Sequence, residues 1–77
     1  MEIRLSDLQG KEVTTLTGER LGRIANLIIE STTGELDKLL IDSDGIAPEG
    51  TELDSSGLLS IPFTSVRSVK DMVMVKI

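Results

Sequence analysis

A β-hairpin is the structure that the middle of this chain predicts most clearly. The stretch from Gly18 to Glu30 contains the continuous apolar run Leu27–Ile29, and a polar Ser-Thr-Thr-Gly segment over residues 31–34 follows it directly. A second apolar segment, from Leu36 to Asp42, comes next. Because turn residues between two apolar runs favour a hairpin, we expect one long strand, a turn and a returning strand.

The spacing of apolar residues in the first of these segments also fits a helix. Four of them recur at the i, i+3, i+4, i+7 positions of a helical face; they are Leu21, Ile24, Ala25 and Ile28. A strand is favoured because Gly22 lies inside the segment and a turn follows at once. Since Ile24 and Leu27 would face opposite sides of a flat strand, we expect a bend or β-bulge near Ala25–Asn26.

The rest of the chain predicts several short strands and no long helix. The segments are apolar or rich in β-branched residues, and Gly, Pro or polar residues separate them; they are Lys11–Leu16, Leu58–Pro62, Arg67–Val69 and Met72–Ile77. Residues 6–10 predict a turn or a single helical turn. Short strands with frequent turns are typical of a β-barrel or a rolled sheet, so we expect an all-β protein with a small β-barrel or a rolled antiparallel sheet.

The length and the residue types limit both the size of the core and the chemistry. With 77 residues, we expect a single domain over residues 1–77, near the lower limit for a core that is stable alone. Self-association or docking on a partner is therefore expected. The sequence has no Cys and no His, which removes disulfides, the usual general base near neutral pH and the commonest zinc ligand. We predict a non-enzyme with no catalytic residue, no cofactor and no metal site; a pair of carboxylates for acid–base chemistry is the alternative left open.

The excess of acidic residues lies in one segment. Asp and Glu outnumber Lys and Arg by 13 to 8, and residues 42–54 hold five acids and no base. With its Gly and Pro residues, this composition predicts an acidic loop over residues 43–57. The Asp-Ser-Asp-Gly sequence at 42–45 resembles the start of an EF-hand loop, but Leu40 and Thr51 then occupy the first and last ligand positions. We expect a turn here, with weak cation binding by the carboxylates as the alternative.

No feature of a membrane-spanning or secreted protein is visible. No apolar run approaches the roughly 18–20 residues of a membrane span, and residues 1–7 lack the apolar core of a signal peptide. We expect a cytoplasmic protein with no membrane insertion. The single aromatic residue, Phe63, leaves no stacking surface for single-stranded nucleic acid, and the net charge of −5 opposes phosphate binding. DNA is not expected as a partner, and RNA is disfavoured.

Three motifs, in order along the chain, match those of a known family. Leu8–Val13 has the pattern Leu-x-Gly-Lys-x-Val, and Ile61–Phe63 reads Ile-Pro-Phe before a final hairpin. Between them, Gly18–Asn26 follows Gly-x-x-Leu-Gly-x-Ile-x-Asp, with Asn26 in place of the frequent Asp. In this order and spacing, the chain resembles the PRC-barrel family, named for the photosynthetic reaction centre H subunit. The resemblance implies a six-stranded β-barrel that serves as an interaction module and not as a catalyst.

Outward-facing apolar residues are the candidate interaction residues. Leu36 and Leu40 alternate with the expected core residues of their strand, and Met72 and Met74 do the same near the end of the chain. If the four form one exposed patch, a homodimer or a protein partner follows, because large exposed apolar patches are rare on monomers. The alternative is that both faces of these strands are partly buried.

These observations lead to one hypothesis of function and two alternatives. The chain looks most like the short stand-alone PRC-barrel proteins common in archaea, some of which are associated with the cell-division machinery. We therefore expect a homodimeric adaptor in a cytoplasmic assembly, with archaeal cell division as the setting. Ribosome maturation or RNA processing is an alternative, because a ribosome-maturation factor carries this barrel after another domain. A regulatory barrel that binds an ion or ligand at the acidic loop is the other.

Overall fold

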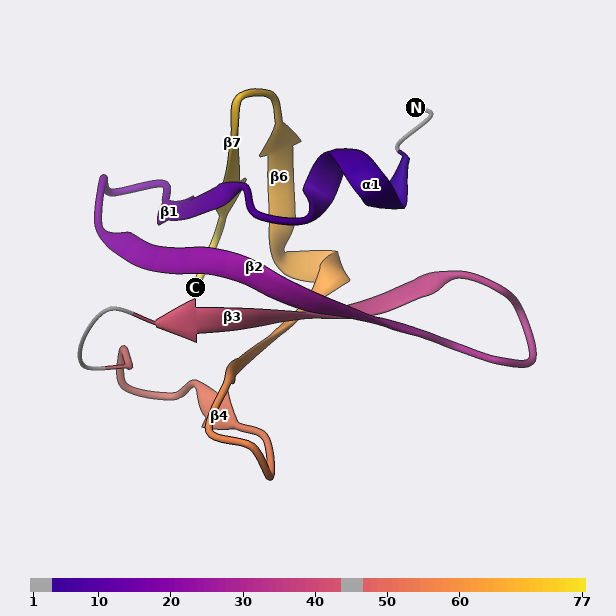
Figure 1. Ribbon diagram of the computed structural model, residues 1–77. Coiled ribbons are helices and arrows are strands. Elements are labelled where there is room, and N and C mark those ends of the chain that lie inside the picture. The colour runs from indigo at the N-terminus through magenta and orange to yellow at the C-terminus, as the bar shows by residue number, and fades with distance from the viewer. Residues whose placement is uncertain (1–3, 44–46) are drawn as a thin grey trace.

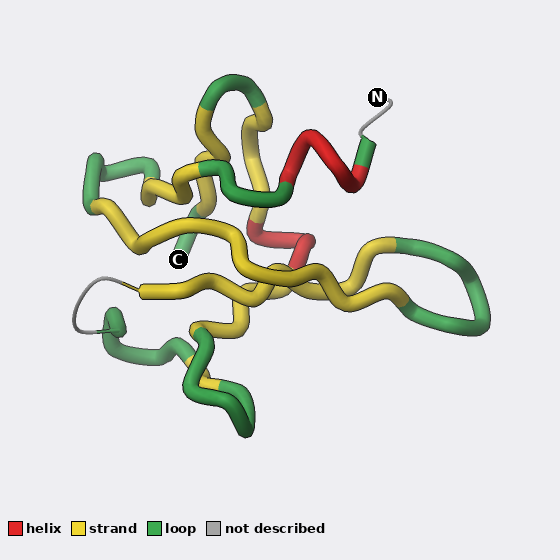
Figure 2. Tube along the Cα trace, viewed as in Figure 1, coloured by secondary structure: helices red, strands yellow, loops and turns green. Residues whose placement is uncertain are grey.

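Seven strands form one mixed sheet in the computed structural model, which describes residues 4–43 and 47–77. The strand order is β4-β5-β3-β2-β1-β7-β6, and Figures 1 and 2 show how the strands curl around one another. The elements in chain order are α1 (Leu5–Leu8), β1 (Glu12–Thr15), β2 (Arg20–Ile29), β3 (Leu36–Ser43), β4 (Glu52–Leu53), β5 (Leu59–Pro62), the 3-10 turn η1 (Phe63–Ser65), β6 (Val66–Val69) and β7 (Met72–Val75). The expected all-β class, with a rolled sheet, is confirmed.

The predicted central hairpin is present. β2 and β3 pair antiparallel along most of their length, which excludes the helical alternative. The register shifts between Ile24 and Asn26, so Ala25 is the extra residue of a β-bulge. Because the bulge changes the alternation, Ile24 is buried and Leu27 also packs against the core. The bend that the sequence predicted at this point is confirmed.

The sheet is rolled but it is not a closed barrel over the described ranges. Its two ends are β4 and β6, and no strand pairing joins them. Two details differ from a six-stranded antiparallel barrel: β1 pairs with β7 in parallel, and a seventh strand, β4, lies inside the predicted acidic loop. β4 has only two residues, and both pair with β5. β5 ends at Pro62, whose nitrogen has no proton to donate. The sheet edge is therefore short at this end.

The core lies inside the curl and draws residues from α1 and from the five strands between the two end strands, β5, β3, β2, β1 and β7. Each of its side chains is at most 3% exposed, and burial of one such side chain contributes about 1.5–3 kcal/mol relative to an exposed position. The members are Leu8, Val13, Leu21, Ile24, Leu39, Ile41, Leu59, Ile61, Val73 and Val75. Since α1 contributes Leu8 and these strands contribute one face each, most side chains on the opposite faces are exposed or half-buried, although Leu40 is buried there too.

Gly22 lets β2 approach β3 more closely than any other residue type would allow. It lies between two neighbours, paired with Val13 of β1 and with Ser43 of β3. A Cβ atom at this position would lie 2.1 Å from the carbonyl oxygen of Asp42, and the φ angle is +142°. Both the space and the backbone conformation therefore require glycine. This explains the second glycine of the Gly-x-x-Leu-Gly motif.

We expect Gly22→Ala to lower the free energy of unfolding by at least about 3 kcal/mol, because backbone strain and a clash with the β3 backbone act together. Chemical denaturation followed by circular dichroism would measure the loss. The matched control is Gly34→Ala in the β2–β3 turn. Gly34 also has a positive φ, of +74°, but an added Cβ would meet nothing within 4 Å, so only about 1–2 kcal/mol of backbone strain is expected there. Equal losses in the two variants would contradict the close approach.

Candidate functional site

The outer face of β1 and β7 carries two of the four predicted interaction residues. The parallel register places Met72 beside Glu12 and Met74 beside Thr14. Val73, between the two methionines, is fully buried. Because successive side chains of a strand point to opposite faces, both methionines lie on the outer face. Met72 is 41% exposed and Met74 is half-buried.

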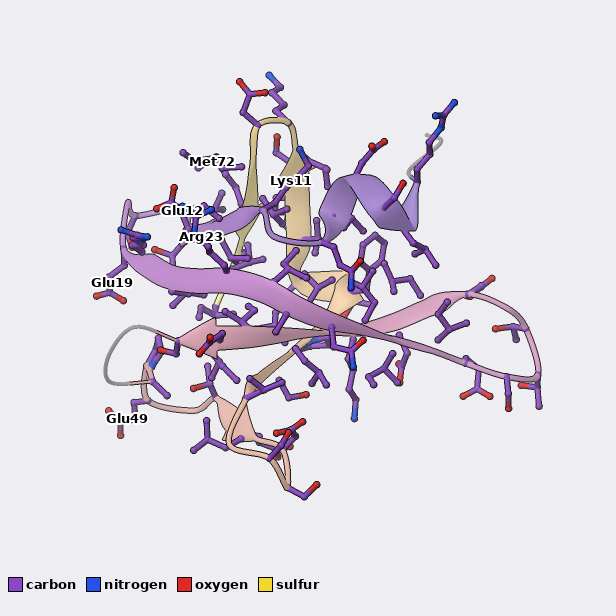
Figure 3. The ribbon with its side chains drawn as sticks, in the orientation of Figure 1. Lys11, Glu12, Glu19, Arg23, Glu49 and Met72 are labelled. Atoms are coloured by element: carbon purple, nitrogen blue, oxygen red, sulfur yellow. The ribbon has the colours of Figure 1, made fainter. Side chains whose placement is uncertain are left out.

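Charged groups of both signs border these methionines. The Nε of Arg20 forms an ion pair with the Oε1 of Glu12, and the register pairs Glu12 with Arg23 as well. The Nη1 of Arg23 donates a hydrogen bond to the Gly10 carbonyl at 3.0 Å. Figure 3 shows Glu12, Arg23 and Met72 grouped over β1 and the adjoining strands. An apolar strip beside paired charges is the composition of a protein-binding surface more than of a catalytic site.

Leu16 is an apolar residue of this region that the sequence analysis missed. It follows β1 directly, and its N–H donates to the Val75 carbonyl at 3.1 Å, so it continues the pairing with β7. Its side chain is exposed. Leu16 could have been found from the alternation of side chains along β1. Thr14 and Leu16 flank Thr15, which is buried, so both belong to the opposite face. We call Thr14, Leu16, Met72 and Met74 the methionine face.

The other two predicted residues lie elsewhere in the sheet. Leu36 and Leu40 belong to β3, and both β2 and β1 lie between that strand and β7. Leu40 is only 7% exposed and pairs with Asn26 and Ser60, whereas Leu36 is half-buried and packs against the core. The four side chains therefore do not form one continuous patch. A role in binding stays a prediction for each of them.

A groove of about 580 Å³ lies beside β5, bordered by the segment 49–52 and by residues 76–77. Lys38 and Lys76 supply two ammonium groups to its lining, and Glu49 and Glu52 supply two carboxylates. The buried Ile61 and the exposed Pro62 add an apolar part. The groove therefore combines charges of both signs with apolar groups, and the hydroxyls of Thr51, Ser60 and Ser65 also line it.

The acidic loop predicted over residues 43–57 is structured where it is described. Asp54 closes the turn between β4 and β5: its Oδ1 accepts hydrogen bonds from the N–H groups of Ser56 and Leu58, at 2.9 and 2.8 Å. The Ser56 hydroxyl donates to the same carboxylate. Of the Asp-Ser-Asp-Gly sequence, Asp44 and Gly45 lie outside the described residues. Among residues 4–43 and 47–77, no three acidic, His or Cys side chains are placed to hold a metal ion.

Asp54 gives the loop a defined response to acid. The hydrogen bond from the Leu58 N–H is the main cause that lowers the pKa of Asp54 below its ordinary value of 3.8, and the bonds from Ser56 act in the same direction. Because the folded pKa lies below the unfolded one, the stabilisation is complete above the ordinary pKa and is lost as the pH falls through the folded value.

We expect Asp54→Asn to melt at a lower temperature than the wild type at neutral pH, because the amide keeps one acceptor oxygen but loses the charge. The difference should shrink on acidification from about pH 5 to pH 2, where the wild-type carboxylate becomes protonated. Thermal melts followed by circular dichroism across this range would measure it. Glu49→Gln, at an exposed position of the same loop, is the control for loss of one charge. A gap that stays constant with pH would show that Asp54 does not act through its ionisation.

The comparisons with known proteins agree with this architecture. Within the described part of the chain, neither helical segment is long and apolar enough to cross a membrane. No curated protein matches the sequence. The sequence model of the PRC-barrel domain family matches residues 1–77 of the chain. Two of the motifs have structural roles. Leu8–Val13 joins α1 to β1, and Gly18–Asn26 contains Gly22, which allows the close approach of β2 to β3. The chain belongs to the PRC-barrel domain family.

Proposed function

We propose that the protein is a non-catalytic interaction module that forms a symmetric dimer through its methionine face and acts as an adaptor. The single observation that carries the proposal is the exposure of Met72, at 41%, on the outer face of β7. A methionine side chain is flexible and polarisable, so it adapts to an apolar partner surface. The absence of His and Cys from the sequence supports the non-catalytic part of the proposal.

The charges beside the methionine face support a second copy as the partner. In a two-fold symmetric contact, each residue of one copy meets the corresponding region of the other. Glu12 and Arg23 are cross-strand neighbours next to Met72, so an acid of one copy can face a base of the other. Such pairing favours correct orientation more than it adds affinity. The apolar contact of Met72 and Leu16 supplies the affinity in this proposal.

Archaeal cell division is the setting that we propose for the adaptor. Its support is the likeness of this short chain to the stand-alone members of the PRC-barrel family, some of which are associated with the cell-division machinery. An affinity-tagged copy, recovered from its native cells under gentle lysis and analysed by mass spectrometry, tests this setting. Division-ring components are the expected result. Ribosomal proteins in their place would move the function to ribosome maturation and contradict the division role.

For the dimer, we expect Met72→Lys to raise the dissociation constant by about 100-fold, because a buried ammonium group would replace the central apolar contact. Light scattering across the micromolar range would show a wild-type dimer and a monomeric variant. Leu53→Lys is the matched control, since Leu53 is 60% exposed and lies on β4, at the far end of the sheet from β7. This control should remain a dimer. A wild-type monomer over the whole range would overturn the proposal.

A further inference from the structure

The end of the β2–β3 hairpin is a ribbon of two strands with no third strand beside it in the described part of the chain. The hydrogen bonds from the segment before β1 reach β2 only as far as Ile24, and β5 pairs with β3 only over Lys38–Ile41. Figure 1 shows the hairpin extending away from the rest of the sheet, on the opposite side from the turn that joins β1 to β2. We call residues 28–37 the arm.

Exposed apolar side chains lie on both faces of the arm. Ile28 and Ile29 are 38% and 43% exposed, and as successive strand residues they point to opposite faces. Ile29 pairs with Leu36, which is half-buried against the core. The Ile29–Leu36 pair therefore continues the apolar face of the core onto the protruding arm. Among residues 4–43 and 47–77, no strand pairs with this ribbon on its outer edges.

The arm is acidic throughout. Glu30, Glu35 and Asp37 are all exposed, and residues 28–37 contain no Lys or Arg. A hydrogen bond from the Thr32 N–H is the main cause that lowers the pKa of Glu30, so this carboxyl stays ionised at neutral pH. Ile29 is thus next to Glu30 in the chain, whereas Ile28 has Lys38, the residue that follows the arm, as its cross-strand partner.

Local hydrogen bonds hold the turn of the arm in one conformation. The Glu30 N–H donates to the Glu35 carbonyl, and the Gly34 N–H to the Glu30 carbonyl, both at 2.8 Å. The Thr32 hydroxyl donates to the Glu30 carboxylate at 2.9 Å. A partner would therefore meet a formed ribbon, with little entropy lost on ordering it.

We propose that the arm docks a basic amphipathic segment of a protein partner, whose apolar side chains cover Ile29 and Leu36 and whose Lys or Arg residues meet the carboxylates. Charge selects this occupant. Two copies of the arm would repel each other, and so would the arm and either nucleic acid or an anionic lipid surface. The arm is also separate from the methionine face, so an adaptor could hold its two partners at different places.

The test uses the full chain and a fluorescent peptide with leucine and lysine at helical spacing. Fluorescence anisotropy should show binding that weakens as salt is added. Ile29→Thr, which keeps a β-branched side chain, and Glu35→Lys in the turn should each weaken binding by about tenfold. The matched control is Glu49→Lys, an exposed acid outside the arm, which should change affinity by less than about twofold.

Two further measurements separate docking on the arm from attraction by net charge and from self-association. In ¹⁵N–¹H spectra, the peptide should shift the amide signals of residues 28–37 and leave those of the methionine face unchanged. Equal weakening by Glu35→Lys and Glu49→Lys, or shifts spread over all acidic segments, would overturn the proposal in favour of net charge alone. Loss of the dimer in Ile29→Thr would overturn it in favour of a second copy as the occupant. Because Met72→Lys leaves the arm intact, peptide binding by that variant separates this proposal from the dimer.

Discussion

The close contact between β2 and β3 at Gly22 is the constraint on which the rest of the sheet depends. The absence of a side chain lets the Asp42 carbonyl approach the β2 backbone, and the bulge at Ala25 then turns the remainder of the strand. Together they fix which side chains of the longest strand face inward. β2 also lies between β1 and β3. The faces that its side chains take therefore determine which side chains of both neighbouring strands lie on the same face.

The two surfaces that we propose for binding follow from that register. β1 lies beside β2 and pairs in parallel with β7, so the burial of Val13 and Val73 forces Met72 onto the outer face. On the other side of β2, the hairpin is longer than the strands that flank it, and its end stands free of the sheet as the arm. The same long strand therefore supports one apolar face on the body and one acidic, apolar ribbon at a distance from it.

These two surfaces differ in the kind of partner they suit. The methionine face has charges of both signs at its border, which suits a symmetric contact with a second copy. The arm has charges of one sign, which suits a partner of the opposite sign. The core of this domain is small. A partner that binds only the folded state would raise the free energy of unfolding by mass action.

Local patterns in the sequence determined the hairpin, the bulge near Ala25–Asn26 and the inward face of most strands. Leu36 is an exception: alternation places it on the outer face, but the register shifts between Ile28 and Ile29, and Leu36 packs against the core. These features depend on residues close together in the chain: turn residues at 31–34, and two apolar residues, Ile24 and Leu27, that a flat strand would have placed on opposite faces. The motif glycine at position 22 was visible too, although its contact with Asp42 was not. The expected all-β class follows from the same short-range signals.

Only the tertiary structure decided how strands distant in the sequence pair and what covers their outer faces. Alternation places Leu40 and Met72 equally on outer faces, yet Leu40 is buried between β2 and β5 whereas Met72 lies in the open. The parallel pairing of β1 with β7 and the open ends of the sheet depend on long-range contacts that no local pattern encodes. The physical reason is that a residue's face is set by the backbone repeat of its own strand, whereas its exposure is set by whichever element the fold brings beside it.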